Sequence, residues 1–103
     1  MQMKTNKQEK IMRFAVIGTG YIFKSEKYIF KITKRAKIVA LVDKNEKLVK
    51  KYAKQMKIPW FTSSENLYAS NIEFDAVYIA TPHHTHFSLM KEAMEHGKHI
   101  LCD

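Results

Sequence analysis

The stretch IMRFAVIGTG, residues 11–20, decides the fold of this chain. It is an apolar, β-branched run that stops abruptly at Gly18, as a buried strand does when it enters a tight turn. Over residues 22–36, apolar and small residues then recur at steps of three and four between lysines: Ile22, Ser25, Ile29, Ile32 and Ala36. This spacing is typical of an amphipathic helix. The opening therefore predicts a strand, a glycine turn and a helix in direct succession.

The alternation of apolar runs and helical patterns continues to the end of the chain. Apolar runs predict strands at residues 37–42, 60–62, 74–80 and 98–102, and helical spacing predicts helices from Asn45 to a stop at Pro59, over 62–68 and over 85–96. Thr62 and Glu65 have the spacing of a capping box, and Gly97 suits a helix C-cap. Such alternation builds a parallel sheet, because each crossover is right-handed. We therefore predict an α/β fold, a doubly wound parallel sheet with strand order 3-2-1-4-5 in three layers.

Size and composition limit the chain to one domain. Of its 103 residues 46% are hydrophobic, which is enough for a core, and no apolar run approaches the roughly 18 residues that cross a bilayer. The polar residues 1–10 are predicted to be a flexible tail, and residues 11–103 the folded domain. Cys102, the single cysteine, cannot form an internal disulfide, and the polar opening lacks the apolar core of a secretory signal. We therefore expect a cytoplasmic protein with no membrane partner.

The net charge of +8 is concentrated in one part of the sequence. Between Lys24 and Lys57 there are twelve Lys or Arg residues against three acidic ones. Such asymmetry can mark a nucleic-acid face. Lysines are more often the solvated backs of amphipathic helices, and aromatic residues suited to base stacking are not obviously interleaved among these. We therefore interpret these lysines as the solvent-exposed faces of amphipathic helices, and nucleic-acid binding is only a distant alternative.

A glycine turn and a later aspartate form the first candidate site. Gly18-Thr19-Gly20 lies between the first strand and the first helix, where a glycine turn lets backbone N–H groups and the helix dipole meet a dinucleotide pyrophosphate. Asp43 ends the second strand, where its carboxylate could accept hydrogen bonds from the adenosine ribose. The alternative is structural: the glycines only make a turn, and Asp43 caps the next helix.

A histidine-rich segment forms the second candidate site. Residues 81–86, TPHHTH, follow the fourth strand at its carboxyl end, on the rim where open α/β sheets bind ligands. Three histidines suggest a metal, but a transition-metal site needs compatible geometry and usually a ligand from elsewhere, which the sequence does not announce. We therefore predict no metal and interpret the segment as a polar rim beside the nicotinamide end of a dinucleotide.

Four segments, in order and spacing, resemble the nucleotide-binding half of the Gfo/Idh/MocA oxidoreductases. They are IMRFAVIGTG, ALVD at 40–43, FDAVYIATPHHTH at 74–86 and EHGKHILCD at 95–103. The ATP-x-x-x-H stretch followed by GKH is the specific part. The resemblance implies a Rossmann-like NAD(P)-binding domain that a larger α+β substrate domain follows in the family. It also implies hydride transfer between NAD(P) and a sugar, polyol or related carbonyl compound.

The resemblance also implies roles for individual residues. Gly18 and Gly20 would hold the pyrophosphate, Asp43 would face the adenosine ribose, and the cofactor cleft would be lined at its other end by Thr81, Pro82 and His86. The full set of expected cofactor contacts is Gly18, Thr19, Gly20, Tyr21, Ile22, Asp43, Lys44, Thr81, Pro82, His83 and His86. NAD is the expected cofactor, because the Asp43 carboxylate repels a 2′-phosphate. The positive charge of Lys44 partly offsets this repulsion, so NADP remains an alternative.

This sequence also departs from the family pattern. Phe23 stands where glycine or alanine is usual, His83 replaces the usual asparagine, and Asp103 takes the position of the glutamate in a Glu-Lys-Pro motif. No lysine follows, so we predict no catalytic residue and expect a catalytically incomplete cofactor domain without the family's C-terminal substrate domain. We expect a homo-oligomer, or a partnership with that missing domain. The competing interpretation is a non-catalytic regulatory module that has lost the cofactor.

Overall fold

A parallel five-stranded sheet forms the centre of the molecule in the computed structural model, which describes residues 10–102. Of the predicted tail, only Lys10 lies inside these residues, and Asp103 lies outside them. The strands are β1 Met12–Ile17, β2 Ala36–Val42, β3 Trp60–Phe61, β4 Ala76–Ile79 and β5 His99–Cys102. The helices are α2 Ile22–Ile32, α3 Glu46–Met56, α4 Ser64–Ala69 and α5 His86–Glu95, with a 3₁₀ turn η1 at His83–Thr85. The order β3-β2-β1-β4-β5 confirms the predicted topology.

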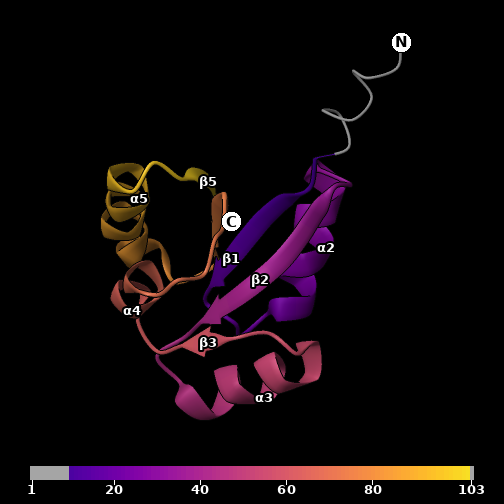
Figure 1. Cartoon of the computed structure of the whole chain (residues 1–103). Coiled ribbons are helices and arrows are strands. Elements are labelled where there is room, and N and C mark those ends of the chain that lie inside the picture. The colour runs from indigo at the N-terminus through magenta and orange to yellow at the C-terminus, as the bar shows by residue number, and fades with distance from the viewer. Residues whose placement is uncertain (1–9, 103) are drawn as a thin grey trace.

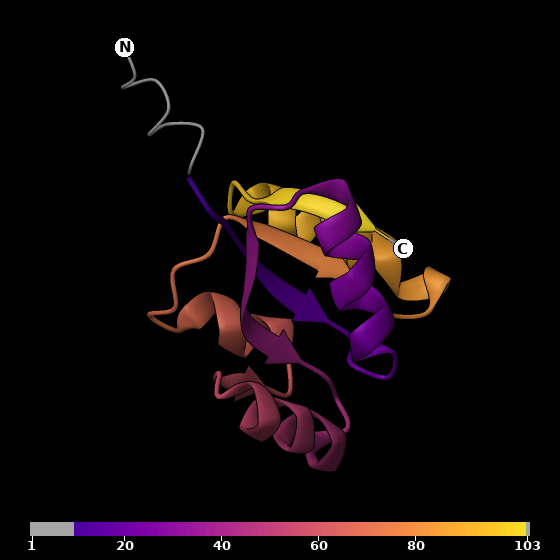
Figure 2. The same ribbon diagram turned by 90° about the vertical axis from the view of Figure 1, so that its right-hand side faces the viewer.

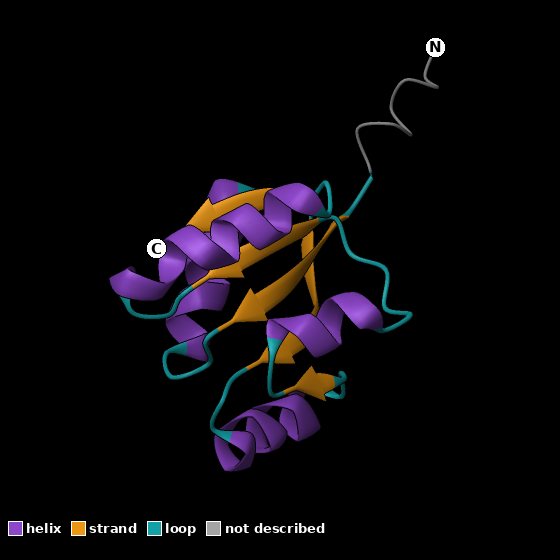
Figure 3. Cartoon of the chain, turned by 90° about the vertical axis from the view of Figure 1, so that its left-hand side faces the viewer, coloured by secondary structure: helices purple, strands orange, loops and turns teal. Residues whose placement is uncertain are grey.

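The sheet is covered by helices on both faces because its central strand is apolar on both sides. Phe14 and Val16 of β1 share one core with residues of α2 and α3. Ala15 and Ile17 alternate with them and share the opposite core with residues of α4 and α5. Figure 1 shows α2 on one side of the sheet and α4 and α5 on the other. The three-layered, Rossmann-like α/β fold is therefore confirmed, and Figure 3 shows the strands between helices.

The strand register brings three loops together at one edge of the sheet. Ile17, the last residue of β1, pairs with Val42 of β2 on one side and with Ile79 of β4 on the other. All three strands are parallel and end at the same edge, as their arrowheads show in Figure 2. The loops that follow them are therefore neighbours, although they begin at residues 18, 43 and 80. Ligands of open α/β sheets bind at this carboxyl edge.

The predicted helix 22–36 is too long by four residues. It ends at Ile32, which is 56% exposed and not on the buried face, and Thr33 has an extended backbone. The chain must turn there to start β2, since Ala36 pairs with Met12 in the sheet. The Ile32 and Ala36 matches to the helical spacing were therefore coincidental.

Smaller differences concern where elements begin and end. The cap of α4 is Ser63, whose side chain accepts a hydrogen bond from Asn66 N at 3.2 Å, so the predicted capping box at Thr62 is wrong by one residue. Helix α3 ends before Pro59, through a left-handed Lys57 with φ 59°. Gly97 has the positive φ expected after α5. No helix in residues 10–102 is long and apolar enough to cross a membrane.

Candidate functional site

Gly18 makes the closest approach between the loop after β1 and its neighbours. Its N–H donates to Val42 O at 2.7 Å, and its φ is +99°, a conformation that L side chains rarely adopt. A Cβ on this residue would lie 2.9 Å from the backbone carbonyl carbon and oxygen of Ala80 and 3.0 Å from Thr81 Cγ2. Gly18 is therefore required by the fold itself, where the ends of β2 and β4 meet β1.

Gly20 lies in a different environment. A Cβ on Gly20 would meet no heavy atom within 4 Å beyond its own chain neighbours. The helix that follows, α2, has no side-chain cap at Tyr21 and no acidic residue in its first turn. Within the described part of the chain, the N–H groups of Gly20 and Tyr21 donate no hydrogen bond. Open space beside an uncapped helix N-terminus suits an anion, because the helix dipole and the free N–H groups both favour negative charge.

Asp43 is tied to the glycine loop by hydrogen bonds to both of its oxygens. Thr19 donates its N–H and its hydroxyl to Asp43 Oδ2, each at 2.8 Å, and Asn45 donates its N–H to Oδ1 at 2.9 Å. Partial burial raises the pKa of the Asp43 carboxyl, but these hydrogen bonds and the charge of Lys44 outweigh it and lower the pKa below its ordinary value. Asp43 is therefore a fixed negative charge at the edge of the loop.

The structural alternative for Asp43 is wrong. The cap of α3 is Asn45, whose side-chain oxygen accepts from Leu48 N at 3.1 Å. Asp43 instead joins the end of β2 to the loop after β1. The tie between Thr19 and Asp43 was not predicted from the sequence. Its one sequence signal is a hydroxyl residue between the two glycines, since such a side chain can donate to a nearby carboxylate.

The segment after β4 forms the other end of the site. His86 Nε2 lies 2.7 Å from Thr81 O, to which it donates, and the hydroxyls of Thr81 and Thr85 are 2.6 Å apart. The His83 and His86 rings stack with centroids 5.0 Å apart. Residues 10–102 contain no group of three His, Cys, Asp or Glu side chains that could hold a metal ion. These contacts make the segment a hydrogen-bonded rim next to Gly18.

The remaining predicted contacts differ in what they can offer a ligand. Ile22 is buried and its N–H donates to Thr19 O at 3.3 Å, whereas Tyr21 is 74% exposed. Lys44 and His83 are exposed beside Asp43 and His86 respectively. The structure thus brings Gly18, Thr19 and Asp43 together with Thr81 at one edge of the sheet.

Phe23 does not fill the glycine loop. Its ring is 65% exposed and makes an edge-on contact with the ring of Tyr52 in α3, with centroids 5.7 Å apart. The Phe23 side chain therefore points away from the strand and toward α3. The space beside Gly20 therefore stays open.

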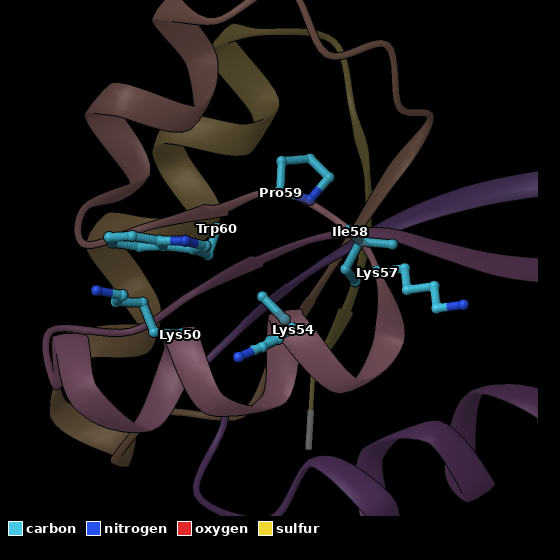
Figure 4. Close-up of a pocket in the computed structure, with 7 residues that line it drawn as sticks. Lys50, Lys54, Lys57, Ile58, Pro59 and Trp60 are labelled. Atoms are coloured by element: carbon cyan, nitrogen blue, oxygen red, sulfur yellow. The ribbon is translucent and has the colours of Figure 1, made fainter.

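A shallow depression of about 520 Å³ lies elsewhere, between α3 and β3 (Figure 4). Lysines and apolar side chains line it, and Lys50 Nζ is 5.8 Å from the centre of the Trp60 ring. None of its lining residues belongs to the predicted cofactor site.

The lysines of α3 are exposed along the helix, as expected of the solvated face of an amphipathic helix.

A protein-family model, the Gfo/Idh/MocA model described as "Oxidoreductase family, NAD-binding Rossmann fold", matches residues 12–103. The chain belongs to this family. The match confirms the resemblance found in the sequence and includes both candidate loops. The part of the chain that matches is the NAD-binding domain of these oxidoreductases.

Curated members of the Gfo/Idh/MocA family are similar to this chain over a quarter of their own length. The 2,7-anhydro-N-acetylneuraminate hydratase of Mediterraneibacter gnavus is 32% identical over 95 residues, which cover 91% of this chain and 24% of that protein. The UDP-N-acetylglucosamine 3-dehydrogenase of Acidithiobacillus ferrooxidans is 33% identical over 94 residues, covering 89% and 28%. The chain therefore corresponds to only the N-terminal part of full-length relatives.

Solved structures of the same fold contain the cofactor. An oxidoreductase from Agrobacterium radiobacter in complex with NAD+, L-tartaric acid and magnesium matches with a TM-score of 0.77 at 29% identity, over 90% of this chain and 27% of that one. The WlbA dehydrogenase from Bordetella pertussis in complex with NADH and UDP-GlcNAcA matches with a TM-score of 0.78 at 26% identity, over 90% and 28%. Dinucleotide binding is thus a property of Gfo/Idh/MocA relatives with this fold.

Proposed function

We propose that this chain binds NAD(H) along the carboxyl edge of its sheet, as the cofactor domain of a Gfo/Idh/MocA oxidoreductase. The observation that carries the proposal is the open space at Gly20 beside the uncapped N-terminus of α2. The N–H groups of Gly20 and Tyr21 are available there to a pyrophosphate. The N–H of Thr19 is not, since Asp43 accepts it.

Asp43 is the group for the adenosine ribose. A carboxylate has about four acceptor positions, and three of those on Asp43 are used by Thr19 and Asn45. The remaining position, on Oδ1, is free to accept a ribose hydroxyl. Because the pKa of Asp43 is lowered, the group is charged at neutral pH and repels a 2′-phosphate. These features favour NAD over NADP.

The segment after β4 serves the nicotinamide end. Thr81 lies against Gly18, and the hydrogen bond from His86 to Thr81 O holds the turn through Pro82 and His83 in one shape. A bound nicotinamide supplies hydride chemistry, and these residues orient and enclose it. Reduction or oxidation of a sugar- or polyol-type substrate is the reaction we propose for the whole protein. This substrate class is supported by relatives named for UDP-N-acetylglucosamine and scyllo-inositol.

The test is titration calorimetry of the full chain with NAD+. Gly20→Ala places a methyl group in the open space and should weaken binding at least about tenfold, a loss of about 1.4 kcal/mol. Phe23→Ala is the matched control on the same turn, because its ring points to Tyr52, and it should bind within about twofold of wild type. A wild-type chain that gives no heat with NAD+, or Gly20→Ala binding as wild type does, would contradict the proposal.

A further inference from the structure

Thr19 is buried, although the residues that follow it in the loop face solvent. Its side chain has no exposed surface, whereas Gly20 and Tyr21, which follow it, are exposed. Its hydroxyl donates to Asp43 Oδ2 at 2.8 Å, the same oxygen that accepts its N–H. The hydroxyl is therefore turned away from any ligand and can act on one only through Asp43.

The two ties on Oδ2 and the one on Oδ1 fix the orientation of the carboxylate. Without the hydroxyl, Asn45 N–H would still hold Oδ1 and Thr19 N–H would hold Oδ2 as a single donor, so the carboxylate could tilt about its side-chain bonds. With both donors of Thr19 on Oδ2, the second oxygen has one defined direction. Hydrogen bonds to a charged acceptor are about twice as strong as neutral ones, so this arrangement is hard to displace.

We propose that the Thr19 hydroxyl is a positioning group that holds Asp43 toward the adenosine ribose and so sets the preference for NAD over NADP. The inference rests on the proposed function, NAD(H) binding at the glycine loop. A carboxylate held in place accepts a 2′-hydroxyl well and cannot turn away from a 2′-phosphate. With one donor on Oδ2 instead of two, the carboxylate could tilt, and it would lose part of its interaction with the 2′-hydroxyl and part of its repulsion of a 2′-phosphate. The neighbouring Lys44 would then favour the phosphate.

A purely structural role for Thr19 makes a different prediction. If the hydroxyl only joined the loop to β2, its loss would lower the thermal stability and weaken NAD+ and NADP+ binding by the same factor. A positioning role changes the ratio of the two affinities. That ratio therefore separates the two roles, and stability does not.

The experiment compares Thr19→Val, which keeps the shape and removes the donor, with Thr19→Ser, which keeps the donor. Dissociation constants for NAD+ and NADP+ are measured by calorimetry on the full chain, together with the melting temperature of each variant. We expect Thr19→Val to lower the NAD+/NADP+ affinity ratio about three- to tenfold, and Thr19→Ser to restore it to within about twofold of wild type.

An unchanged ratio in Thr19→Val, or equal weakening of both dinucleotides, overturns the inference while the proposed function stands. Wild-type protein that binds neither dinucleotide overturns both. If Thr19→Val does not fold, Thr19→Ala removes the same donor without added bulk in this fully buried position and is judged by the same ratio.

Discussion

Substitution of Gly18 by alanine should destabilise the fold strongly, and the structure gives the size of the effect. The new Cβ would lie 2.9 Å from the carbonyl carbon and oxygen of Ala80, which are backbone atoms and cannot swing aside. A forced shift of this kind costs about 1–3 kcal/mol. A side chain at φ +99° costs a similar amount, about 1–3 kcal/mol. We expect a loss of about 2–5 kcal/mol, a large part of the about 5–15 kcal/mol that stabilises a typical domain.

The assay is thermal and urea unfolding of Gly18→Ala, followed by circular dichroism, with Gly20→Ala as the matched control. For a domain of this size, Gly18→Ala should lower the melting temperature by at least about 10 °C. Gly20→Ala introduces the same methyl group into open space and should shift stability by no more than about 0.5 kcal/mol. Equal melting temperatures for wild type and Gly18→Ala would refute the reasoning.

Three further predictions concern Asp43 and Phe23. Asp43→Asn should lower the free energy of unfolding by about 1–3 kcal/mol in a urea denaturation assay. Both carboxylate oxygens accept backbone N–H groups, and the amide of asparagine must turn its own N–H toward one of them. The control is Glu95→Gln, which makes the same charge change at an exposed site and should leave the stability unchanged. The pKa of Asp43 is lowered in the folded state, so the carboxylate contributes to folding stability above its unfolded pKa. This contribution is lost as the pH falls below about 4. The wild type should therefore lose more stability than Asp43→Asn over that acid range. Phe23→Ala should cost about 0.5–1.5 kcal/mol through the lost contact with Tyr52; no change in its urea midpoint would contradict this.

The sequence was sufficient for the topology because each element carried its own periodic signal. The apolar run of β1 and the alternation after it predicted the strand order that the structure shows. The errors are at element ends, where a tertiary requirement overrides a local pattern. The helical spacing continues through Ile32 and Ala36, but Ala36 must pair with Met12 in the sheet. Similarly, Thr62 and Ser63 are both capping residues by type, and only the turn geometry selects Ser63.

The candidate site was predictable in part. The positions of Gly18 and Asp43 follow from where strands end, so sequence placed both at the same edge of the sheet. The hydrogen bonds from Thr19 to Asp43 join residues 24 positions apart. They depend on the register between β1 and β2, in which Ile17 pairs with Val42, and a single sequence does not specify that register. The hydrogen bonds that join Asp43 to the glycine loop were therefore not found from sequence.

Phe23 shows which part of the glycine fingerprint this fold needs. Glycine or alanine at that position is explained by close packing of the helix on the strand. In α2 the side chains buried against the sheet are Ile22, Ser25 and Ile29, and Phe23 is directed outward to Tyr52. The close approach that does exclude a side chain is at Gly18, against Ala80. A bulky residue at position 23 is thus compatible with an intact loop, so its presence does not count against cofactor binding. Gly18 meets the structural requirement of the turn, and Gly20 is the glycine beside which we propose that the pyrophosphate binds.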